Sequence, residues 1–145
     1  MFNLEKQELK NKKVIIRVDL NVPLDDKFNV TDTTRIEACK ETIDLILDKG
    51  GTCILISHFG RPKEREDKFS LKHIVETVSD VLDHPVFFHN DCIGDKVQEV
   101  ISNLNPADII LLENLRFYKE ETLGDILFAE ELSKLGDIYV NDAFG

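Results

Sequence analysis

The stretch Thr52–Ser57 reads TCILIS, a short run in which almost every side chain is apolar or small. A strand covered on both faces of a parallel sheet has this composition, because neither face meets water. Four other runs in the chain have a similar composition, and the five runs together predict five buried strands. The other four runs of this kind are Lys13–Val18 (KVIIRV), Val86–Phe88 (VFF), Asp108–Leu112 (DIILL) and Asp137–Val140 (DIYV).

Amphipathic segments separate these runs and predict four helices. In the first, Ile36, Cys39 and Ile43 lie on one face. Thr34–Glu37 predicts a capping box at its start, and Gly50 marks its end. The alternation predicts right-handed βαβ units, and hence one three-layer α/β/α domain with a Rossmann-like open parallel sheet of at least five strands. The apolar faces of the other three helices lie in Leu71–Leu82 after a Ser70 cap, in Val97–Leu104, and in Phe128–Leu135 before Gly136.

The composition narrows the class of protein. The 145 residues have a formal net charge of −10, and their 42% hydrophobic and 32% charged residues are typical of a globular domain. The acidic balance argues against nucleic-acid and anionic-membrane partners, which both need a basic face. Cys39, Cys53 and Cys92 lack the short spacing of a disulfide or metal framework, and no apolar run is as long as a membrane span. We expect a cytoplasmic protein.

Polar and cationic side chains follow the predicted strands. Asp19-Leu20-Asn21 follows the first strand, His58-Phe59-Gly60-Arg61 follows the second, and Arg116 lies shortly after the fourth. Ligands of open α/β sheets bind outside the carboxyl ends of the strands, where these segments meet. The chain has only five arginines, and Arg35, Arg61 and Arg116 all lie in these loops or at the start of the first helix. Because guanidinium groups suit carboxylates and phosphates, we expect one small, multiply anionic ligand.

Arg35 is the most informative of these arginines. It lies in the predicted first turn of a helix, where the helix dipole already presents positive charge. A cation there is unfavourable by a few tenths of a kcal/mol, roughly, unless an anion binds beside it. The alternative is an exposed arginine whose stem covers apolar surface. Its coincidence with Arg61 and Arg116 favours the functional interpretation.

Simpler interpretations exist for several other polar residues. Asp19 also suits a turn or a helix cap, and His58 suits a partner for backbone groups at a strand end. His73 and His84 are expected to be solvated. The acidic side chains are expected to form one solvated face; they are Glu113, Glu120, Glu121, Asp125, Glu130 and Glu131.

Two absences in the sequence bear on cofactors. His89–Cys92 mixes ligand types without a second cluster, so we expect no metal site in this chain. Neither common phosphate cradle, GxxxxGK[ST] or GxGxxG, is present, so we expect no nucleotide cofactor to bind this chain. Together the two expectations describe half of an active site: this chain would hold an anionic metabolite, but neither a metal ion nor a nucleotide.

Five segments, in this order and approximate spacing, resemble the motifs of the phosphoglycerate kinase family. Leu20 and Phe59 depart from the family pattern, which more usually has Phe and Leu there, but both changes exchange one apolar side chain for another. The resemblance covers nearly the whole chain. Its five segments are Arg17–Leu24 (RVDLNVPL), Asp32–Ile36 (DTTRI), Ile56–Lys63 (ISHFGRPK), Leu111–Tyr118 (LLENLRFY) and Val140–Gly145 (VNDAFG).

The resemblance implies a two-domain kinase of glycolysis with a hinge between its domains. Residues 1–145 would be the N-terminal domain, which binds 3-phosphoglycerate or 1,3-bisphosphoglycerate, incomplete at its C-terminal end. The C-terminal domain, absent here, would bind Mg²⁺ with ADP or ATP. The family sheet has an expected six strands in the order 3-4-2-1-5-6, so the run Asp137–Val140 would lie at an exposed edge. The intact enzyme is expected to be a monomer, and this chain alone to be inactive and to self-associate through that edge.

The family motifs also imply roles for individual residues. Asp19 and Asn21 would contact the hydroxyl and carboxyl end of the substrate, and Arg35 would be catalytic, facing the transferring phosphoryl group. The substrate-binding set would be completed by Leu20, Phe59 and Gly60 and by the three residues that hold the 3-phosphate, which are His58, Arg61 and Arg116.

Two other classes of protein compete with this interpretation. The first is a short chain that binds an anionic metabolite without catalysis, as a sensor or partner module. The second is a receiver-type or flavodoxin-like signalling domain. A receiver needs clustered acidic residues and a lysine after particular strands, whereas these loops present arginine and histidine, so this class is disfavoured.

Overall fold

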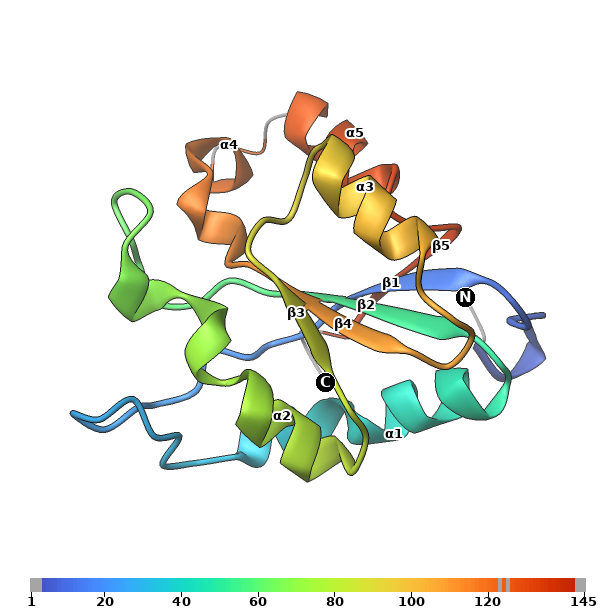
Figure 1. Ribbon diagram of the computed structural model, residues 1–145, viewed down its shortest axis with the longest axis horizontal. Helices are drawn as coiled ribbons and strands as arrows, with labels where there is room; N and C mark the ends of the chain where they lie inside the picture. Colours follow the sequence, from blue (N-terminus) through green and yellow to red (C-terminus); the bar gives the residue numbers. More distant parts are fainter. Residues whose placement is uncertain (1–3, 123, 125, 143–145) are drawn as a thin grey trace.

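A computed structural model describes residues 4–122, 124 and 126–142 of the chain (Figure 1). Its strands are β1 (Lys13–Arg17), β2 (Thr52–Ile56), β3 (Phe87–His89), β4 (Ile109–Leu112) and β5 (Ile138–Asn141). Its α-helices are α1 (Thr34–Asp48), α2 (Val75–Leu82), α3 (Asp95–Ser102), α4 (Lys119–Thr122) and α5 (Ile126–Ser133). Short 3₁₀ helices are η1 (Leu4–Lys6), η2 (Asp67–Phe69), η3 (Leu71–His73) and η4 (Leu115–Phe117).

All five predicted strands form one parallel sheet in the order β3-β4-β2-β1-β5. This order matches the first five strands that the family resemblance implied. In the register, Ile15 of β1 lies between Ile54 of β2 and Tyr139 of β5. Within the described residues β3 and β5 are the two edges. The last three residues of the VNDAFG segment, and Asp125 of the acidic set, lie outside the described residues.

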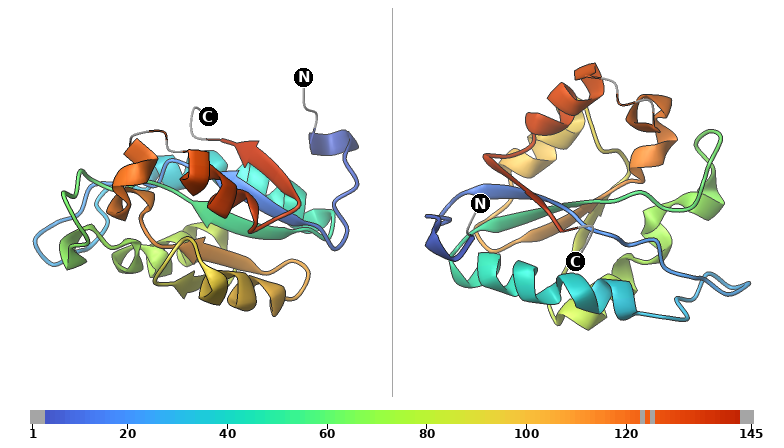
Figure 2. Two further views of the ribbon diagram at one scale, coloured as in Figure 1. Left: turned by 90° about the horizontal axis from the view of Figure 1, so that it is seen from above. Right: turned by 180° about the vertical axis from the view of Figure 1, so that it is seen from behind.

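Helices cover both faces of the sheet, as the three-layer prediction requires (Figures 1 and 2). Val14 and Ile16 of β1 point to the face covered by α1 and α2, whereas Ile15 points to the face covered by α3 and α5. This alternation divides the core into two clusters, since successive side chains of a strand lie on opposite faces. Cys39 and Cys53 are buried in the first cluster, as expected. Within the described residues, no helix is both long and apolar enough to cross a membrane.

The start of α1 differs from the prediction. The capping box at Thr34–Glu37 is wrong, because Thr33 is the N-cap and the backbone N–H of Thr34 donates to Asp32 Oδ1 at 2.9 Å. The Asp32 carboxylate thus accepts from the first N–H of the helix. In the predicted capping box, the Thr34 hydroxyl would have accepted from an N–H further along the helix. The helix still begins at Thr34, so Arg35 lies in its first turn as predicted.

The second predicted helix is divided. Ser70 caps it as expected, accepting from the backbone N–H of Lys72, but the first turn is the 3₁₀ helix η3. The α-helix proper begins only at Val75. The break matters for the site, because Ser70 and Leu71 are both bound to a side chain at the end of β4.

Candidate functional site

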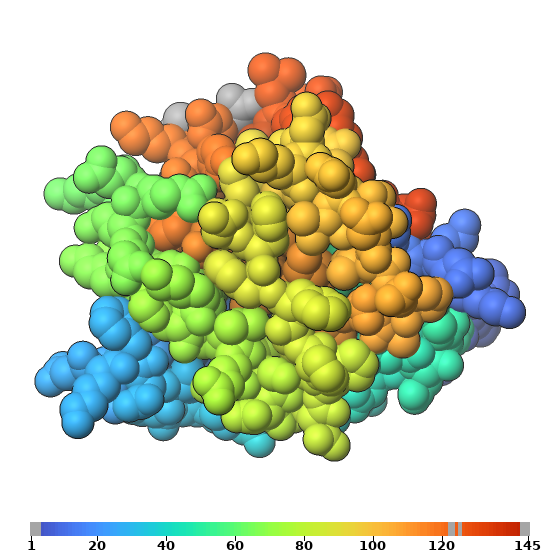
Figure 3. Space-filling model, in the orientation of Figure 1, coloured from blue at the N-terminus to red at the C-terminus, as the bar shows by residue number. Residues whose placement is uncertain are grey.

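The carboxyl ends of β1, β2 and β4 meet at one edge of the sheet, on the left of Figure 1. The loops that follow these strands lie at this edge, and the segments near residues 25 and 63 project from it in Figure 3. We call this region the strand-end site and define it by the segments 17–21, 57–61 and 113–121 together with Arg35.

Arg35 folds back from α1 onto the loop after β1. Its Nη1 donates to the backbone oxygen of Asn21 at 2.7 Å and lies 3.3 Å from Asp19 Oδ1. The same carboxylate oxygen accepts from the backbone N–H of Asn21 at 3.0 Å, so Asp19 does form the turn that its simpler interpretation predicted. The Arg35 side chain is 51% exposed, which leaves the rest of its guanidinium open to an anion.

Two polar side chains join the loop after β1 to the loop after β2. Asn21 Oδ1 accepts from the backbone N–H of Gly60 at 2.9 Å. The buried hydroxyl of Ser57 accepts from the backbone N–H of Leu20 at 3.0 Å and donates to the backbone oxygen of His58 at 2.9 Å. The two loops are therefore fixed relative to one another without any ligand.

Gly60 is the one position in these loops where a side chain has no room. Its φ of +62° lies in the left-handed region, and a Cβ there would lie 2.4 Å from the ring of Phe69. Glycine alone combines this backbone conformation with that close approach. The turn that places His58 and Arg61 therefore depends on it.

A partly buried carboxylate lies between two arginines on the far side of the strand-end site. Glu121, whose side chain is only 10% exposed, accepts from Arg17 Nη2 at 2.7 Å and lies 3.5 Å from Arg116 Nε. Glu121 neutralises part of this positive charge and holds both guanidinium groups in place. Arg116 Nε is itself buried without a hydrogen-bond partner within the described residues.

His58 lies among these charges. Partial burial and the nearby guanidinium of Arg116 lower the pKa of His58, and Arg17 adds to the effect, while Asp19 and Glu121 oppose it. The imidazole is therefore neutral at pH 7 in the free protein. A bound phosphate would oppose the effect of the arginines and favour the charged imidazolium.

Comparisons with known proteins show the family to which the chain belongs. A family model described as Phosphoglycerate kinase matches residues 4–145. The chain belongs to the phosphoglycerate kinase family. A protein of this name from Bradyrhizobium diazoefficiens is 51% identical over 141 residues, or 97% of this chain and 35% of that protein. "Phosphoglycerate kinase 3, cytosolic" of Arabidopsis thaliana is 49% identical over 98% of this chain and 35% of that protein.

Solved structures show the same relation. The crystal structure of phosphoglycerate kinase from Pyrococcus horikoshii superposes with a TM-score of 0.88 at 33% identity, covering 99% of this chain and 37% of that one. The structure from Coxiella burnetii gives 0.83 at 34% identity, covering 96% and 34%. This member of the phosphoglycerate kinase family thus spans about a third of the length of its relatives.

The structure brings most of the predicted site residues of this phosphoglycerate kinase family member together, but not all in the same way. Asp19, Asn21 and Arg35 are in direct contact, and Arg116 lies close enough to His58 to lower the pKa of the imidazole. The side chains of Leu20 and Phe59 are buried, at 0% and 5% exposed, so they anchor the loops. Arg61 is exposed, and within the described part of the chain no contact joins it to the others.

Two predictions about side chains around the strand-end site are wrong. Glu113 and Glu121 are not part of a solvated acidic face: Glu113 is buried and accepts three hydrogen bonds, and the half-buried Glu121 pairs with Arg17 and Arg116. His73 is not solvated either: its ring stacks on Phe28, with centroids 4.2 Å apart, and its Nε2 lies 2.8 Å from the backbone oxygen of Asp67. Most of the partners of Glu113, Glu121 and His73 lie far away in the sequence. The polar character of these three side chains was therefore the only guide, and it predicted exposure to solvent.

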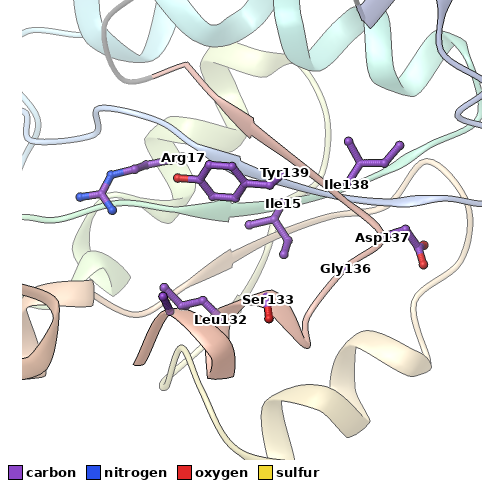
Figure 4. A pocket seen from close by; sticks show the side chains of 9 residues that line it. Ile15, Arg17, Leu132, Ser133, Gly136, Asp137, Ile138 and Tyr139 are labelled. Carbon is purple, nitrogen blue, oxygen red and sulfur yellow. The ribbon is translucent and has the colours of Figure 1, made fainter. Parts of the chain in front are cut away.

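Cavities lie on both sides of the strand-end site. One of about 270 Å³ is lined by Asn21, Gly60 and the rings of Phe28, Phe59 and Phe69. A larger one of about 430 Å³ lies between α5 and β5, with Arg17 at one end and Asp137 at the other (Figure 4). Its middle is formed by apolar side chains, so Arg17 is the only cation that it shares with the strand-end site among its lining residues.

Proposed function

We propose that this chain binds 3-phosphoglycerate or 1,3-bisphosphoglycerate at the strand-end site. The observation behind this proposal is the gathering of Arg17, Arg35, His58 and Arg116 at the carboxyl ends of three neighbouring strands, in a chain whose net charge is −10. A chain so acidic overall gathers cations at one edge where an anion is to bind. The family relationship supports a phosphoglycerate as that anion.

We propose that a protein carrying this sequence together with the part of its relatives that the sequence does not cover is a phosphotransferase of glycolysis. Its reaction is 1,3-bisphosphoglycerate + ADP giving 3-phosphoglycerate + ATP. Phosphoryl transfer needs alignment and charge stabilisation, and no covalent nucleophile. In this proposal Arg35 faces the transferring phosphoryl group, and Asp19 and Asn21 hold the carboxyl and hydroxyl end. His58, Arg61 and Arg116 hold the 3-phosphate.

The nucleotide and its Mg²⁺ are proposed to bind outside these 145 residues, in the part of the relatives that this chain does not cover. The described residues contain no group of three or more His, Cys, Asp or Glu side chains placed to hold a metal ion. Hinge closure would bring the two substrates into line and exclude water.

The setting of the proposed enzyme follows from its relatives. A cytoplasmic location is supported by the cytosolic relatives from Arabidopsis thaliana and Nicotiana tabacum. Within this proposal the intact enzyme is a monomer whose partners are small molecules, with no nucleic acid or membrane.

Calorimetric titration of the chain with 3-phosphoglycerate tests the proposal. We expect weak binding that weakens further at high salt, because the contacts are between charges. Arg116→Ala and Arg61→Ala should each weaken binding by about 1.5–3 kcal/mol, as for charge-assisted hydrogen bonds. Arg65→Ala is the matched control: Arg65 pairs with Asp91 and donates to the Asn90 backbone, so its loss should leave affinity unchanged. Equal effects of Arg65→Ala and Arg116→Ala would contradict the proposal.

A further inference from the structure

Asn114, two residues beyond the end of β4, is completely buried and uses its whole side-chain amide. Its Oδ1 accepts from the backbone N–H groups of Phe59 and Arg116, each at 3.0 Å. Its Nδ2 donates to the backbone oxygens of Phe59 at 2.7 Å and Phe69 at 3.0 Å. Two acceptor positions and two donor hydrogens are all that a carboxamide offers, so none is left for a ligand.

Two of these four hydrogen bonds, both to Phe59, join the loop after β4 to the loop after β2, and these loops carry cations of the strand-end site. Phe59 is bound through both its N–H and its carbonyl, and it lies directly between His58 and Gly60. Arg116 is bound through its N–H, two residues along the chain from Asn114. This side chain, together with the hydrogen bond from the Leu115 N–H to the Ser57 backbone oxygen at 3.0 Å, therefore sets the separation between the His58 backbone and the Arg116 backbone.

A buried carboxylate fixes the backbone of Asn114 in turn. Glu113 Oε1 accepts from the N–H groups of Asn114 at 2.9 Å and Leu71 at 2.8 Å, and its Oε2 accepts from the Ser70 hydroxyl at 2.6 Å. Glu113 is 4% exposed, and the charge is compensated by these three donors. Asn114 thus has a rigid base, since both its backbone and its side chain are held.

We propose that Asn114 is a positioning residue for the phosphate-binding half of the site, holding the His58–Arg61 loop at the distance from Arg116 that a single phosphate group can bridge. The proposal rests on the proposed function for the identity of the ligand. Charged groups held in place before binding lose less conformational entropy when the ligand arrives. Asn114 therefore acts on affinity through His58, Arg61 and Arg116 while touching no substrate atom.

The test compares Asn114→Ser with two control variants in the 145-residue chain. Asn103→Ser also removes an amide bonded to a backbone oxygen, but at the exposed end of α3. Ile101→Val removes one buried methylene from the second core cluster, so it lowers stability without removing any hydrogen bond of the strand-end site. Thermal unfolding identifies the temperature at which all four proteins are folded, and calorimetry with 3-phosphoglycerate is done there.

We expect Asn114→Ser to raise the Kd by about tenfold or more, since several buried backbone groups lose their partner and the loops move apart. Both controls should stay within about twofold of the wild type. If Asn114→Ser binds as tightly as the controls, the positioning role is wrong. If Ile101→Val loses as much affinity as Asn114→Ser, the effect is one of stability, and the positioning role is again wrong.

A second measurement needs neither ligand nor a well-folded variant. Hydrogen exchange in the wild-type chain should show the Phe59 and Arg116 amides protected to the same degree, because both donate to one oxygen atom. Exchange of either amide at the rate of an open loop would overturn the inference. Should the wild-type chain not bind 3-phosphoglycerate at all, the proposed function fails, and the exchange rates alone decide whether Asn114 joins the two loops.

Discussion

The strand-end site differs from the side of the sheet formed by β5 and α5, which we call the β5–α5 edge, in how its side chains are held. At the strand-end site, Ser57, Glu113 and Asn114 are buried polar residues with several hydrogen bonds each, and they join segments far apart in sequence. At the β5–α5 edge, Tyr139 is 53% exposed and Ile126 is 74% exposed, beside a cavity of about 430 Å³. Among the described residues, hydrogen bonds of buried polar side chains are thus concentrated at the strand-end site, whereas exposed apolar side chains are concentrated at the β5–α5 edge.

The two regions also differ in the partners of their carboxylate groups. At the strand-end site the partly buried carboxylate of Glu121 lies between Arg17 and Arg116. At the end of β5, burial raises the pKa of the Asp142 carboxyl, and a hydrogen bond with Thr42 opposes the rise; Oδ2 of this carboxyl is buried without a hydrogen-bond partner among the described residues. The carboxylate at the strand-end site thus has cationic partners, whereas the carboxyl at the end of β5 is only partly satisfied.

The largest expected effect concerns Arg35. In a protein that joins this chain to its nucleotide-binding part, Arg35→Ala should lower kcat by about 10²–10³-fold, because the guanidinium is assigned to charge that develops in the transition state. Arg65→Ala should change kcat little. Steady-state kinetics in both directions measure this. A rise in KM with kcat unchanged would show that Arg35 only binds substrate.

The second-largest effect concerns the free energy of unfolding, which should fall more for a substitution at the strand-end site than for one at the β5–α5 edge. Glu113→Ala removes the acceptor of three buried donors and should lower the free energy of unfolding by about 1–3 kcal/mol. Tyr139→Ala at the β5–α5 edge should lower it by less than about 1 kcal/mol. Urea unfolding of both variants gives these values. Equal losses would mean that the two regions contribute alike.

A smaller effect is expected from the sheet edge itself. Among the described residues β5 pairs with β1 alone, and Ile138, Tyr139 and Val140 offer neither a charge nor a proline to block another strand. We expect fast amide exchange in β5 and association of the 145-residue chain with itself as concentration rises. Light scattering over a concentration series, with hydrogen exchange, measures both. A monomer at high concentration with β5 strongly protected would contradict this expectation.

The smallest effect is the pH dependence due to His58. Burial and Arg116 lower its pKa, so the folded state binds a proton less readily than the unfolded state. Stability from this group is complete above the unfolded pKa of about 6.5 and falls as the pH drops through the lower folded value. His58→Gln should flatten this part of the stability profile. Bound 3-phosphoglycerate should raise the pKa of His58, which an NMR titration of the ring detects.

Much of the fold could be predicted from sequence because it depends on local patterns. The five apolar runs predicted each strand to within about a residue. The prediction that all are buried is wrong for the edge strands β3 and β5, where Phe87 and Tyr139 are exposed. The meeting of Asp19, His58 and Arg116 at one end of the sheet could be predicted from the parallel strands alone, because the carboxyl ends of parallel strands all lie on one side. The strand order came from the family resemblance.

The supporting residues could not be predicted in this way. Glu113 meets Ser70 and Leu71 across more than forty positions, and Asn114 meets Phe59 across fifty-five. Nothing in the charge or spacing of Glu113 distinguishes a buried carboxylate from a solvated one, so the acidic face was predicted wrongly. The one available signal was its place directly after a buried strand, where solvent is scarce.

We propose that an anionic metabolite binds this chain at the strand-end site and not at the β5–α5 edge. Addition of 3-phosphoglycerate to the isotope-labelled chain, followed by amide NMR spectra, tests it most directly. We predict that the shifts concentrate in Asn21, Gly60 and Arg116, are abolished by Arg116→Ala, and leave Tyr139 of β5 unmoved. Shifts centred on β5 and α5, or none at saturating ligand, would contradict the claim.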